Sequence, residues 1–202
     1  MITVIDYGMG NLRSVVKAIE IYTNDVKIAR NVSEIKGAKA LIMPGDGAFG
    51  AAMENLEAGG WIGPIKEHIA AGGYFLGICL GYQLLFSTSE EFGNHRGLDI
   101  VPGKVVRFPE GELKVPHMGW NAVKFTRDSK FTRGIPDGTH FYFIHTFYPV
   151  PDSKDVILGE AEYGKPFACI IEKGNMIATQ FHPEKSHAAG LKIIENFVRE
   201  SK

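Results

Sequence analysis

The sequence predicts one α/β domain over residues 1–202, with an open, mainly parallel sheet, helices on both faces and an antiparallel extension. Two patterns support this prediction. In the first half, short apolar runs alternate with helical patterns, which is typical of βαβ units in a parallel sheet. In the second half, apolar runs follow one another between turn residues, which indicates antiparallel strands. We find no linker or repeat in the 202 residues, and a hydrophobic content of 45% is ample for one core.

The expected elements follow from these patterns in chain order. The first half predicts strands at 2–6, 39–45 and 74–78, and helices at 12–22, 63–72 and 80–86. The second half predicts strands at 103–108, 120–125, 141–150, 156–163, 167–173 and 176–182. A closing helix is predicted at 188–201, because Leu191, Ile194 and Val198 share one face and Ser186 can serve as its N-cap.

The composition argues against nucleic-acid binding and membrane insertion. The chain has 22 basic and 23 acidic residues, and no Lys/Arg block that would follow a phosphate backbone. It begins without a basic stretch followed by a long apolar one, and no apolar run reaches the ~18 residues of a membrane span. We therefore expect a cytoplasmic protein in which Cys79 and Cys169 are free thiols.

Cys79 stands between two glycines in "GICLG", where a strand pattern meets a helical one. G-x-C-x-G is the cysteine form of the nucleophile elbow, in which glycines permit a tight turn that lifts the side chain out of the sheet. A helix N-terminus at this point stabilises negative charge, which suits a thiol nucleophile. The alternative is a small buried residue at a strand end, and the motif alone leaves the two equally open. Cys169, in "FACIIE", is expected in the core.

A thiol nucleophile needs a base, and the base needs an orienting group. His182 follows an apolar strand in "QFHPEKS", and Glu184 lies two residues on. Alternate side chains of an extended segment share a face, so the imidazole and the carboxylate would project together. Pro183 places the pair at a strand end. A polar strand exit is the alternative for "HPE" alone, but combined with the elbow it favours a Cys79-His182-Glu184 triad.

The loop "PGDGAFG" (44–50) matches G-x-G-x-x-G, yet no acidic residue ends the next strand, so the dinucleotide fingerprint is incomplete. Its backbone N–H groups could instead stabilise an oxyanion beside Cys79, and a plain turn is the other alternative. There is no HExxH motif and no cysteine pair, and His140 and His145 fall on opposite faces of one strand. The sequence therefore predicts neither a metal site nor a cofactor.

Together, "PGDGAFG", "GICLGYQLLF" and "TQFHPEKS" resemble, over nearly the whole chain, the triad (class I) glutamine amidotransferases, whose fold is flavodoxin-like. "DYGMGNLRSV", "KVPHMGWN" and "YFIHTFYPV" further resemble the glutaminase subunits of imidazole glycerol phosphate synthases, which act in histidine biosynthesis. The resemblance implies that Cys79 attacks the glutamine amide, His182 moves the proton to ammonia and Glu184 orients His182. It implies a heterodimer with a (β/α)8-barrel cyclase subunit, which uses the ammonia. Such a barrel needs ~250 residues, so we expect it on a second chain.

The resemblance also assigns further residues. Backbone N–H groups near Asp46 and at Leu80 would bind the oxyanion. Glutamine contacts map to Gly47, Gln83, Thr146 and Phe147. The partner face maps to Asn11, Trp120, Asn121, Tyr142 and Lys185, for which the ordinary alternatives include a core tryptophan, a strand aromatic and a solvated lysine. Asp46 and Phe147 depart from the family pattern, which commonly has an apolar residue and a tyrosine there.

Three rival functions stay open at this point. The chain could be the glutaminase subunit of another amidotransferase, such as that of anthranilate or guanylate synthesis, although "PHMGWN" argues against it. A stand-alone cysteine hydrolase would not release ammonia from glutamine. A non-catalytic binding module with this fold would not react at Cys79 with a glutamine-like electrophile.

Overall fold

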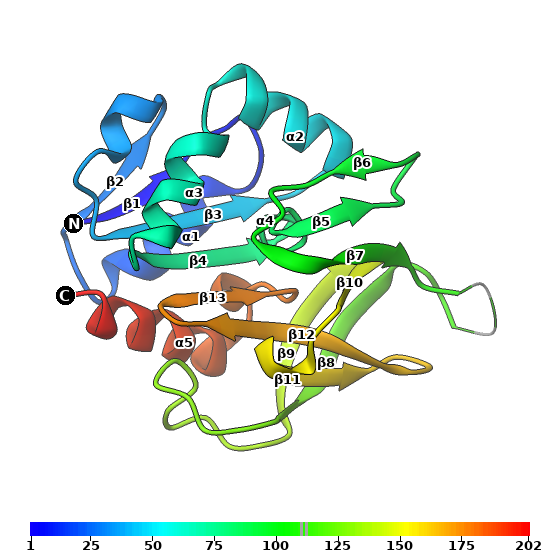
Figure 1. Ribbon diagram of the computed structural model, residues 1–202. Coiled ribbons are helices and arrows are strands. Elements are labelled where there is room, and N and C mark those ends of the chain that lie inside the picture. Colours follow the sequence, from blue (N-terminus) through cyan, green and yellow to red (C-terminus); the bar gives the residue numbers. More distant parts are fainter. Residues whose placement is uncertain (110, 112) are drawn as a thin grey trace.

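The first half of the chain forms strands that alternate with helices, as predicted (Figure 1). The structure, a computed structural model, describes residues 1–109, 111 and 113–202. The strands of this half are β1 (Ile2–Ile5), β2 (Val26–Ala29), β3 (Ala40–Gly45) and β4 (Tyr74–Cys79). Its helices are α1 (Leu12–Glu20), the 3-10 helix η1 (Val32–Ile35), α2 (Phe49–Ala58), α3 (Ile62–Ala70) and the single turn α4 (Leu80–Gln83).

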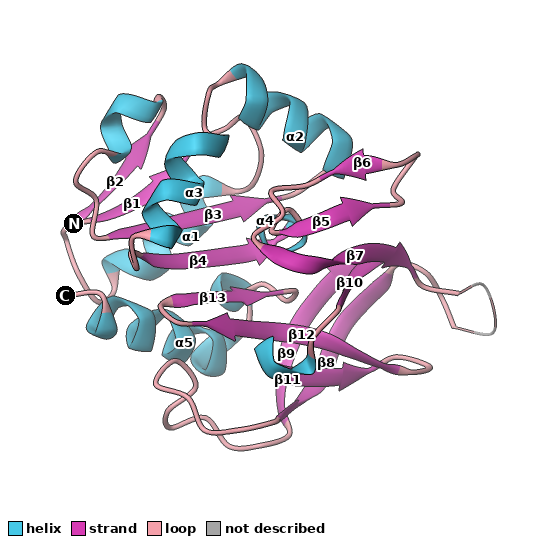
Figure 2. Ribbon diagram, viewed as in Figure 1, coloured by secondary structure: helices cyan, strands magenta, loops and turns pink. Residues whose placement is uncertain are grey.

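The second half is rich in strands and ends in one long helix (Figure 2). Its strands are β5 (Phe86–Ser89), β6 (His95–Arg96), β7 (Val101–Arg107), β8 (His117–Phe125), β9 (Thr139–His145), β10 (Phe147–Pro151), β11 (Ile157–Glu162), β12 (Pro166–Lys173) and β13 (Met176–Thr179). Its helices are the 3-10 helices η2 (Lys154–Val156) and η3 (Pro183–Lys185), and α5 (His187–Glu200).

Within the described residues, nine strands form one mixed sheet in the order β2-β1-β3-β4-β13-β12-β11-β8-β9. The pairs from β2 to β13 are parallel, and those from β13 to β9 are antiparallel. The predicted α/β class with an antiparallel extension is confirmed, and the extension is as large as the parallel part. A second, four-stranded sheet, β10-β7-β5-β6, was not predicted.

The predicted helix at 80–86 is only one turn long. It ends at Gln83, and Phe86 opens β5, which pairs with β6 and β7. The successive residues Leu84, Leu85 and Phe86 are all fully buried. A continued surface helix would bury only one face, so this run is better accommodated in strand structure between neighbouring layers.

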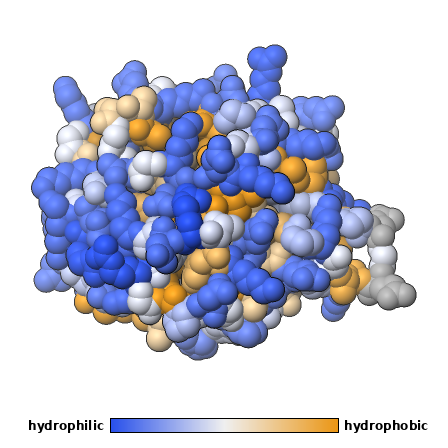
Figure 3. Space-filling view, turned by 60° about the horizontal axis from the view of Figure 1, so that its bottom comes forward, coloured by the Kyte–Doolittle hydropathy of each residue, from blue (hydrophilic) through white to orange (hydrophobic). Residues whose placement is uncertain are grey.

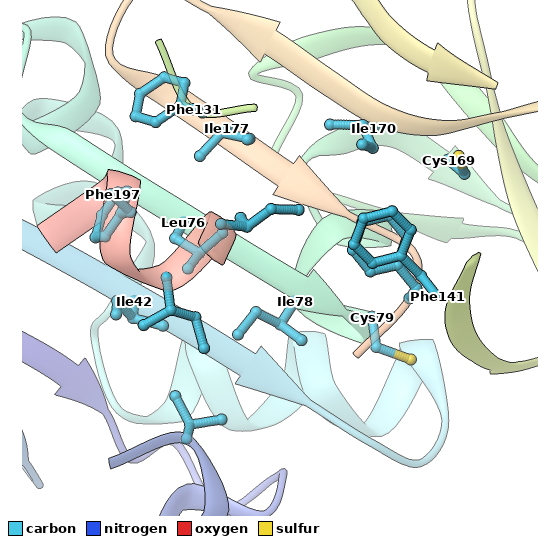
Figure 4. Close-up of a cluster of buried hydrophobic side chains, with 14 of the residues drawn as sticks. Ile42, Leu76, Ile78, Cys79, Phe131, Phe141, Cys169, Ile170, Ile177 and Phe197 are labelled. Carbon is cyan, nitrogen blue, oxygen red and sulfur yellow. The ribbon is translucent and has the colours of Figure 1, made fainter. Parts of the chain in front are cut away.

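Apolar side chains on the two faces of the parallel strands form two core clusters. Ile42, Leu76 and Ile78 point to the cluster that includes α5 through Phe197 (Figure 4). Alternate strand residues such as Leu41 and Phe75 point to the other cluster, which includes residues of α2 and α3. This alternation is the pattern of a sheet that is covered on both faces, and it fixes the strands whose ends carry the candidate site.

The surface in Figure 3 is mainly hydrophilic, with smaller hydrophobic areas between the polar side chains. In the described part of the chain, no helix combines the length and the apolar character needed to cross a bilayer. The cytoplasmic location expected from the sequence stays a prediction.

Candidate active site

Three neighbouring parallel strands end at one edge of the sheet and bring together the segments singled out in the sequence. Gly45, at the end of β3, pairs with Cys79, at the end of β4, and β13 lies on the other side of β4. His182 follows β13 closely. Figure 4 shows Cys79 at the end of β4, at the margin of the buried cluster. Ligand sites of open α/β sheets form at this edge.

Cys79 adopts the strained turn expected of a nucleophile elbow. Its backbone has φ 56° and ψ −107°, a region that a non-glycine residue seldom occupies. The flanking glycines are needed for space: a Cβ at Gly81 would lie 1.9 Å from the carbonyl oxygen of Met43, and one at Gly77 would lie 2.9 Å from that of Gly81. Close packing of Gly81 against β3, and of Gly77 against Gly81 in α4, therefore explains the two glycines in "GICLG".

His182 and Glu184 are in direct contact, with 2.8 Å between Nδ1 and Oε1. The predicted pairing is present, but the reason given for it was incomplete. His182 is extended, with φ −95° and ψ 99°, whereas Glu184 lies in the 3-10 turn η3. The turn brings the carboxylate back to the imidazole, and the Glu184 side chain is only 2% exposed.

The backbone of His182 is held on both sides. Its N–H donates to the carbonyl oxygen of Tyr142 in β9 at 3.0 Å, and its carbonyl accepts from the Ser186 hydroxyl at 2.6 Å. That hydroxyl also accepts from the Tyr142 N–H at 2.9 Å. Ser186 occupies the N-cap position of α5, as predicted, but its side chain makes no capping hydrogen bond. Its hydroxyl fixes His182 instead.

The pKa of His182 is raised from 6.5 to about 10. Burial lowers the pKa, but side-chain hydrogen bonds with Cys79 and Glu184, and the charges of these two groups, raise it by more. At neutral pH the imidazole is therefore protonated and can donate a proton. Gln180 reaches the same thiol, with 3.9 Å between its Nε2 and the sulfur of Cys79.

A cleft of about 400 Å³ opens beside Cys79 and His182. It contains all the residues that the sequence assigned to glutamine binding and the oxyanion, and four that it did not. The predicted lining residues are Asp46, Gly47, Leu80, Gln83, Thr146 and Phe147. The additional ones are Glu91, Pro116, Ile144 and His145; Lys185, assigned to the partner face, also lines it. Nothing in the sequence near Glu91 signals a site, because only the packing of the β5–β6 hairpin beside α2 brings Glu91 to the cleft.

Gln83 is fixed deep in this cleft. Its Nε2 donates to the carbonyl oxygen of Phe147 at 2.9 Å and to Oε1 of Gln180 at 3.2 Å. Glu91 lies at the cleft wall, where one of its carboxylate oxygens accepts from the N–H of Phe49 at 2.6 Å. The N-terminus of α2 thus holds a negative charge at the wall.

Asp46 connects the two glycine-rich loops. Its carboxylate accepts from the N–H of Gly10 at 2.9 Å, which ties "PGDG" to "GMGN". The next residue, Gly47, has φ +94°, a conformation that suits glycine. Because Asp46 directly follows the residue that pairs with Cys79, its backbone lies beside the start of α4, where the first N–H groups of a helix have no partner within the helix.

The residues assigned to a partner face differ in exposure. Trp120 is 45% exposed and stacks on His187 with ring centroids 4.9 Å apart, and Tyr142 meets it edge to face. Trp120 is therefore not a core residue. Asn11 is exposed and accepts from the N–H of Ser14 as the N-cap of α1, while Lys185 is exposed. Asn121 is half-buried, and its Nδ2 donates to the carbonyl oxygen of Glu162 at 2.8 Å.

His140 and His145 lie on opposite faces of β9, as predicted: His140 is exposed and His145 is buried. Among the residues that the structure describes, no group of three or more His, Cys, Asp or Glu side chains is arranged to hold a metal ion.

Residues 3–201 match the family model of class I glutamine amidotransferases. The chain belongs to this family. Among its relatives are three proteins named imidazole glycerol phosphate synthase subunit HisH. The one from Moorella thermoacetica is 52% identical over 97% of this chain and 93% of its own length. Those from Syntrophotalea carbinolica and Aquifex aeolicus are 48% and 47% identical, over 98% of this chain and 98% and 96% of their own lengths.

Solved structures support the fold assignment of this amidotransferase chain. The structure of PurLQS from Thermotoga maritima matches with a TM-score of 0.78 at 16% identity, covering 100% of this chain and 98% of that one. A crystal structure of glutamine amidotransferase matches with a TM-score of 0.75 at 20% identity, covering 99% and 98%. At these identities the likeness concerns the fold alone.

Proposed function

We propose that this amidotransferase is the glutaminase subunit of an imidazole glycerol phosphate synthase, acting in histidine biosynthesis. It hydrolyses glutamine to glutamate and ammonia with Cys79, His182 and Glu184. The observation that carries the proposal is the strained elbow of Cys79, placed in one cleft with a buried His182–Glu184 pair. The name shared by the relatives gives the branch of the family, and favours it over the subunits of anthranilate or guanylate synthesis.

The chemistry follows from the positions of these groups. The proton of the Cys79 thiol passes to His182, and the sulfur attacks the side-chain carbonyl carbon of glutamine, which gives a tetrahedral intermediate. Protonated His182 gives its proton to the amide nitrogen, so the C–N bond breaks, ammonia departs and a thioester remains. Neutral His182 then takes a proton from water, which attacks the thioester, and glutamate leaves as the thiol is restored. Glu184 keeps the imidazole oriented and stabilises its charged form.

We assign the remaining contacts of the substrate by their chemistry. The N–H groups of Asp46 and Leu80 bind the oxyanion of the intermediate. Gln83 and the backbone at 47, 146 and 147 contact the glutamine. Glu91 supplies a negative charge for the α-ammonium group, a contact that the sequence did not reveal.

The partner in this proposal is a cyclase subunit with a (β/α)8 barrel, which forms a heterodimer with this chain and takes up the ammonia. The exposed Trp120, with Tyr142 behind it, provides an aromatic anchor of the kind that interfaces favour. Lys185 reaches both the surface and the cleft, so it lies where the partner face and the active site meet. Asn11 and Asn121 complete the proposed face.

The proposal is tested by measuring glutamate release from the isolated chain and from its complex with the cyclase subunit, with and without the nucleotide ligand of the cyclase. We expect slow turnover alone and an increase of at least tenfold in the ligand-loaded complex, because ammonia released into water is protonated and lost as a nucleophile. Equal turnover under all conditions would contradict the coupling to a cyclase. No release of glutamate under any condition would contradict the glutaminase itself.

Asp46→Asn tests whether the charge of this loop restrains the resting enzyme. A carboxylate about 5 Å from the oxyanion, at an effective dielectric constant of ~20, would oppose it by about 3 kcal/mol. The hydrogen bond from Gly10 holds this carboxylate in the loop, and an asparagine oxygen can accept the same bond. We expect basal glutamate release to rise about tenfold while the activated rate changes much less. An unchanged basal rate would show that the charge of Asp46 does not restrain the resting enzyme and that its role is limited to the hydrogen bond with Gly10.

A further inference from the structure

Two buried histidines that the triad does not use lie next to the cleft. His117 opens β8 and His145 closes β9, and they are direct cross-strand neighbours in this antiparallel pair. Figure 1 labels the two strands. They are 3% and 6% exposed. Nδ1 of His117 is 2.9 Å from Nε2 of His145. Buried polar groups are costly unless each one is hydrogen-bonded, so the other two ring nitrogens also need hydrogen-bond partners.

Both histidines are neutral. Burial lowers the pKa of His117 to about 4. Burial also lowers that of His145 to about 3; the hydrogen bond to Phe147 opposes the shift, and the nearby His117 and His182 add to it. A neutral imidazole has one N–H donor and one acceptor nitrogen, so each ring must hold its proton on one particular side.

The proton positions follow from one end of the chain of hydrogen bonds. Nδ1 of His145 is 2.9 Å from the carbonyl oxygen of Phe147, which can only accept. His145 therefore carries its proton on Nδ1, and its Nε2 is an acceptor. His117 must then donate from Nδ1, which leaves its Nε2 as an acceptor. Nδ2 of Asn121, at 3.3 Å, is the donor to that nitrogen.

The hydrogen bonds of this group all run in one direction, from Asn121 through His117 and His145 to the carbonyl oxygen of Phe147. The orientation of the Asn121 amide is fixed, because its Nδ2 also donates to the carbonyl oxygen of Glu162. Gly119 lies between His117 and Asn121 on the same face of β8 and has no side chain to separate them. The ring of His117 is held between Tyr163 and Phe143, at centroid distances of 4.1 and 5.0 Å.

The carbonyl oxygen of Phe147 is shared with the substrate cleft. It accepts a second hydrogen bond from Nε2 of Gln83, which also donates to Gln180, whose own amide reaches the sulfur of Cys79. Because the N–H of His145 occupies one side of this carbonyl oxygen, the amide of Gln83 can approach it only from the other side. The network is thus continuous from Asn121, next to the exposed Trp120, to the nucleophile.

We propose that His117 and His145 are positioning residues: they fix the carbonyl group of Phe147, and through it the amide of Gln83, in the geometry that binds glutamine. The proposal rests on the proposed function of the cleft. It also gives the amide of Asn121, at the margin of the proposed partner face, a role in the cleft, because this amide donates to His117. If a partner bound around Trp120 and displaced Asn121, the two histidine rings would transmit the change to the cleft.

The test compares His117→Leu with His117→Asn in the complex with the cyclase subunit. The two new side chains have the same shape, and both lose the aromatic packing. Only asparagine places a donor where Nδ1 of His117 was. We expect the KM for glutamine to rise about tenfold in His117→Leu with kcat changed less than threefold, and His117→Asn to restore most of the KM. Tyr163→Phe, which keeps the stacked ring, should leave KM unchanged.

A role limited to packing predicts the reverse order, because a buried asparagine is less stable than a leucine of equal size. Equal KM values for His117→Leu and His117→Asn, or a higher value for His117→Asn, would overturn the proposal. Imidazole ¹⁵N spectra of the wild-type chain at pH 7 give an independent measurement. We expect both rings to be neutral with the proton on Nδ1, and a proton on Nε2 of either ring would overturn it. If the wild-type complex fails to hydrolyse glutamine, the proposed function fails, while these spectra still decide the direction of the hydrogen bonds.

Discussion

Cys79→Ala is expected to lower the rate of glutamine hydrolysis by at least about four decades. Removing the nucleophile of a triad commonly lowers the rate by several decades, because the base then has no nucleophile to activate. In the proposed synthase, the same variant should still support the cyclase reaction when ammonium salts replace glutamine. The two measurements are glutamate release and cyclase turnover in the reconstituted complex.

The matched control is Cys169→Ala. Cys169 is fully buried, and burial raises the pKa of its thiol well above the usual value, so it is an unreactive core residue. This variant should retain wild-type glutaminase activity in the fraction that folds. Retention of near wild-type activity by Cys79→Ala, or its loss in well-folded Cys169→Ala, would refute the assignment of the nucleophile.

Glu184→Gln is expected to lower kcat for glutamine by roughly two to four decades with little change in KM. The amide can still accept a hydrogen bond from His182, but it no longer stabilises the imidazolium by charge. The pKa of His182 is held at about 10 in part by Glu184, so its titration midpoint should move down in the variant. Glutamate release and an NMR titration of the His182 ring measure the two effects.

Glu195→Gln makes the same chemical change at a partly exposed site and serves as the control. Glu195 lies on α5, where it pairs with Lys192 on the surface at 3.1 Å, an ion pair of little energetic weight. We expect no measurable change in kcat. If Glu184→Gln behaves like Glu195→Gln, then Glu184 does not orient or stabilise His182, and the third member of the triad lies elsewhere.

Local sequence patterns predicted most of the parallel half of the fold and the main residues of the candidate site. Alternating apolar runs and helical patterns predicted β1, β3, β4 and α1, because strands and amphipathic helices leave different periods in a sequence. The glycines around Cys79 predicted its strained turn, since the constraint acts within a few residues. The spacing of His182 and Glu184 predicted their contact for the same reason, although a 3-10 turn makes it.

Only the tertiary structure decided how distant segments meet. The run 80–86 has an ambiguous pattern, and the burial of Leu84 to Phe86 between layers made its end a strand. The position of β13 beside β4, which brings His182 to Cys79, depends on pairings between strands about 100 residues apart, which leave no local signal. Long-range packing also places Glu91 in the cleft and pairs His117 with His145. The sequence by itself therefore predicted a nucleophile and its base, whereas long-range packing formed the cleft around Cys79 and His182. Contact free energies between distant residues depend on a geometry that no short window of sequence contains.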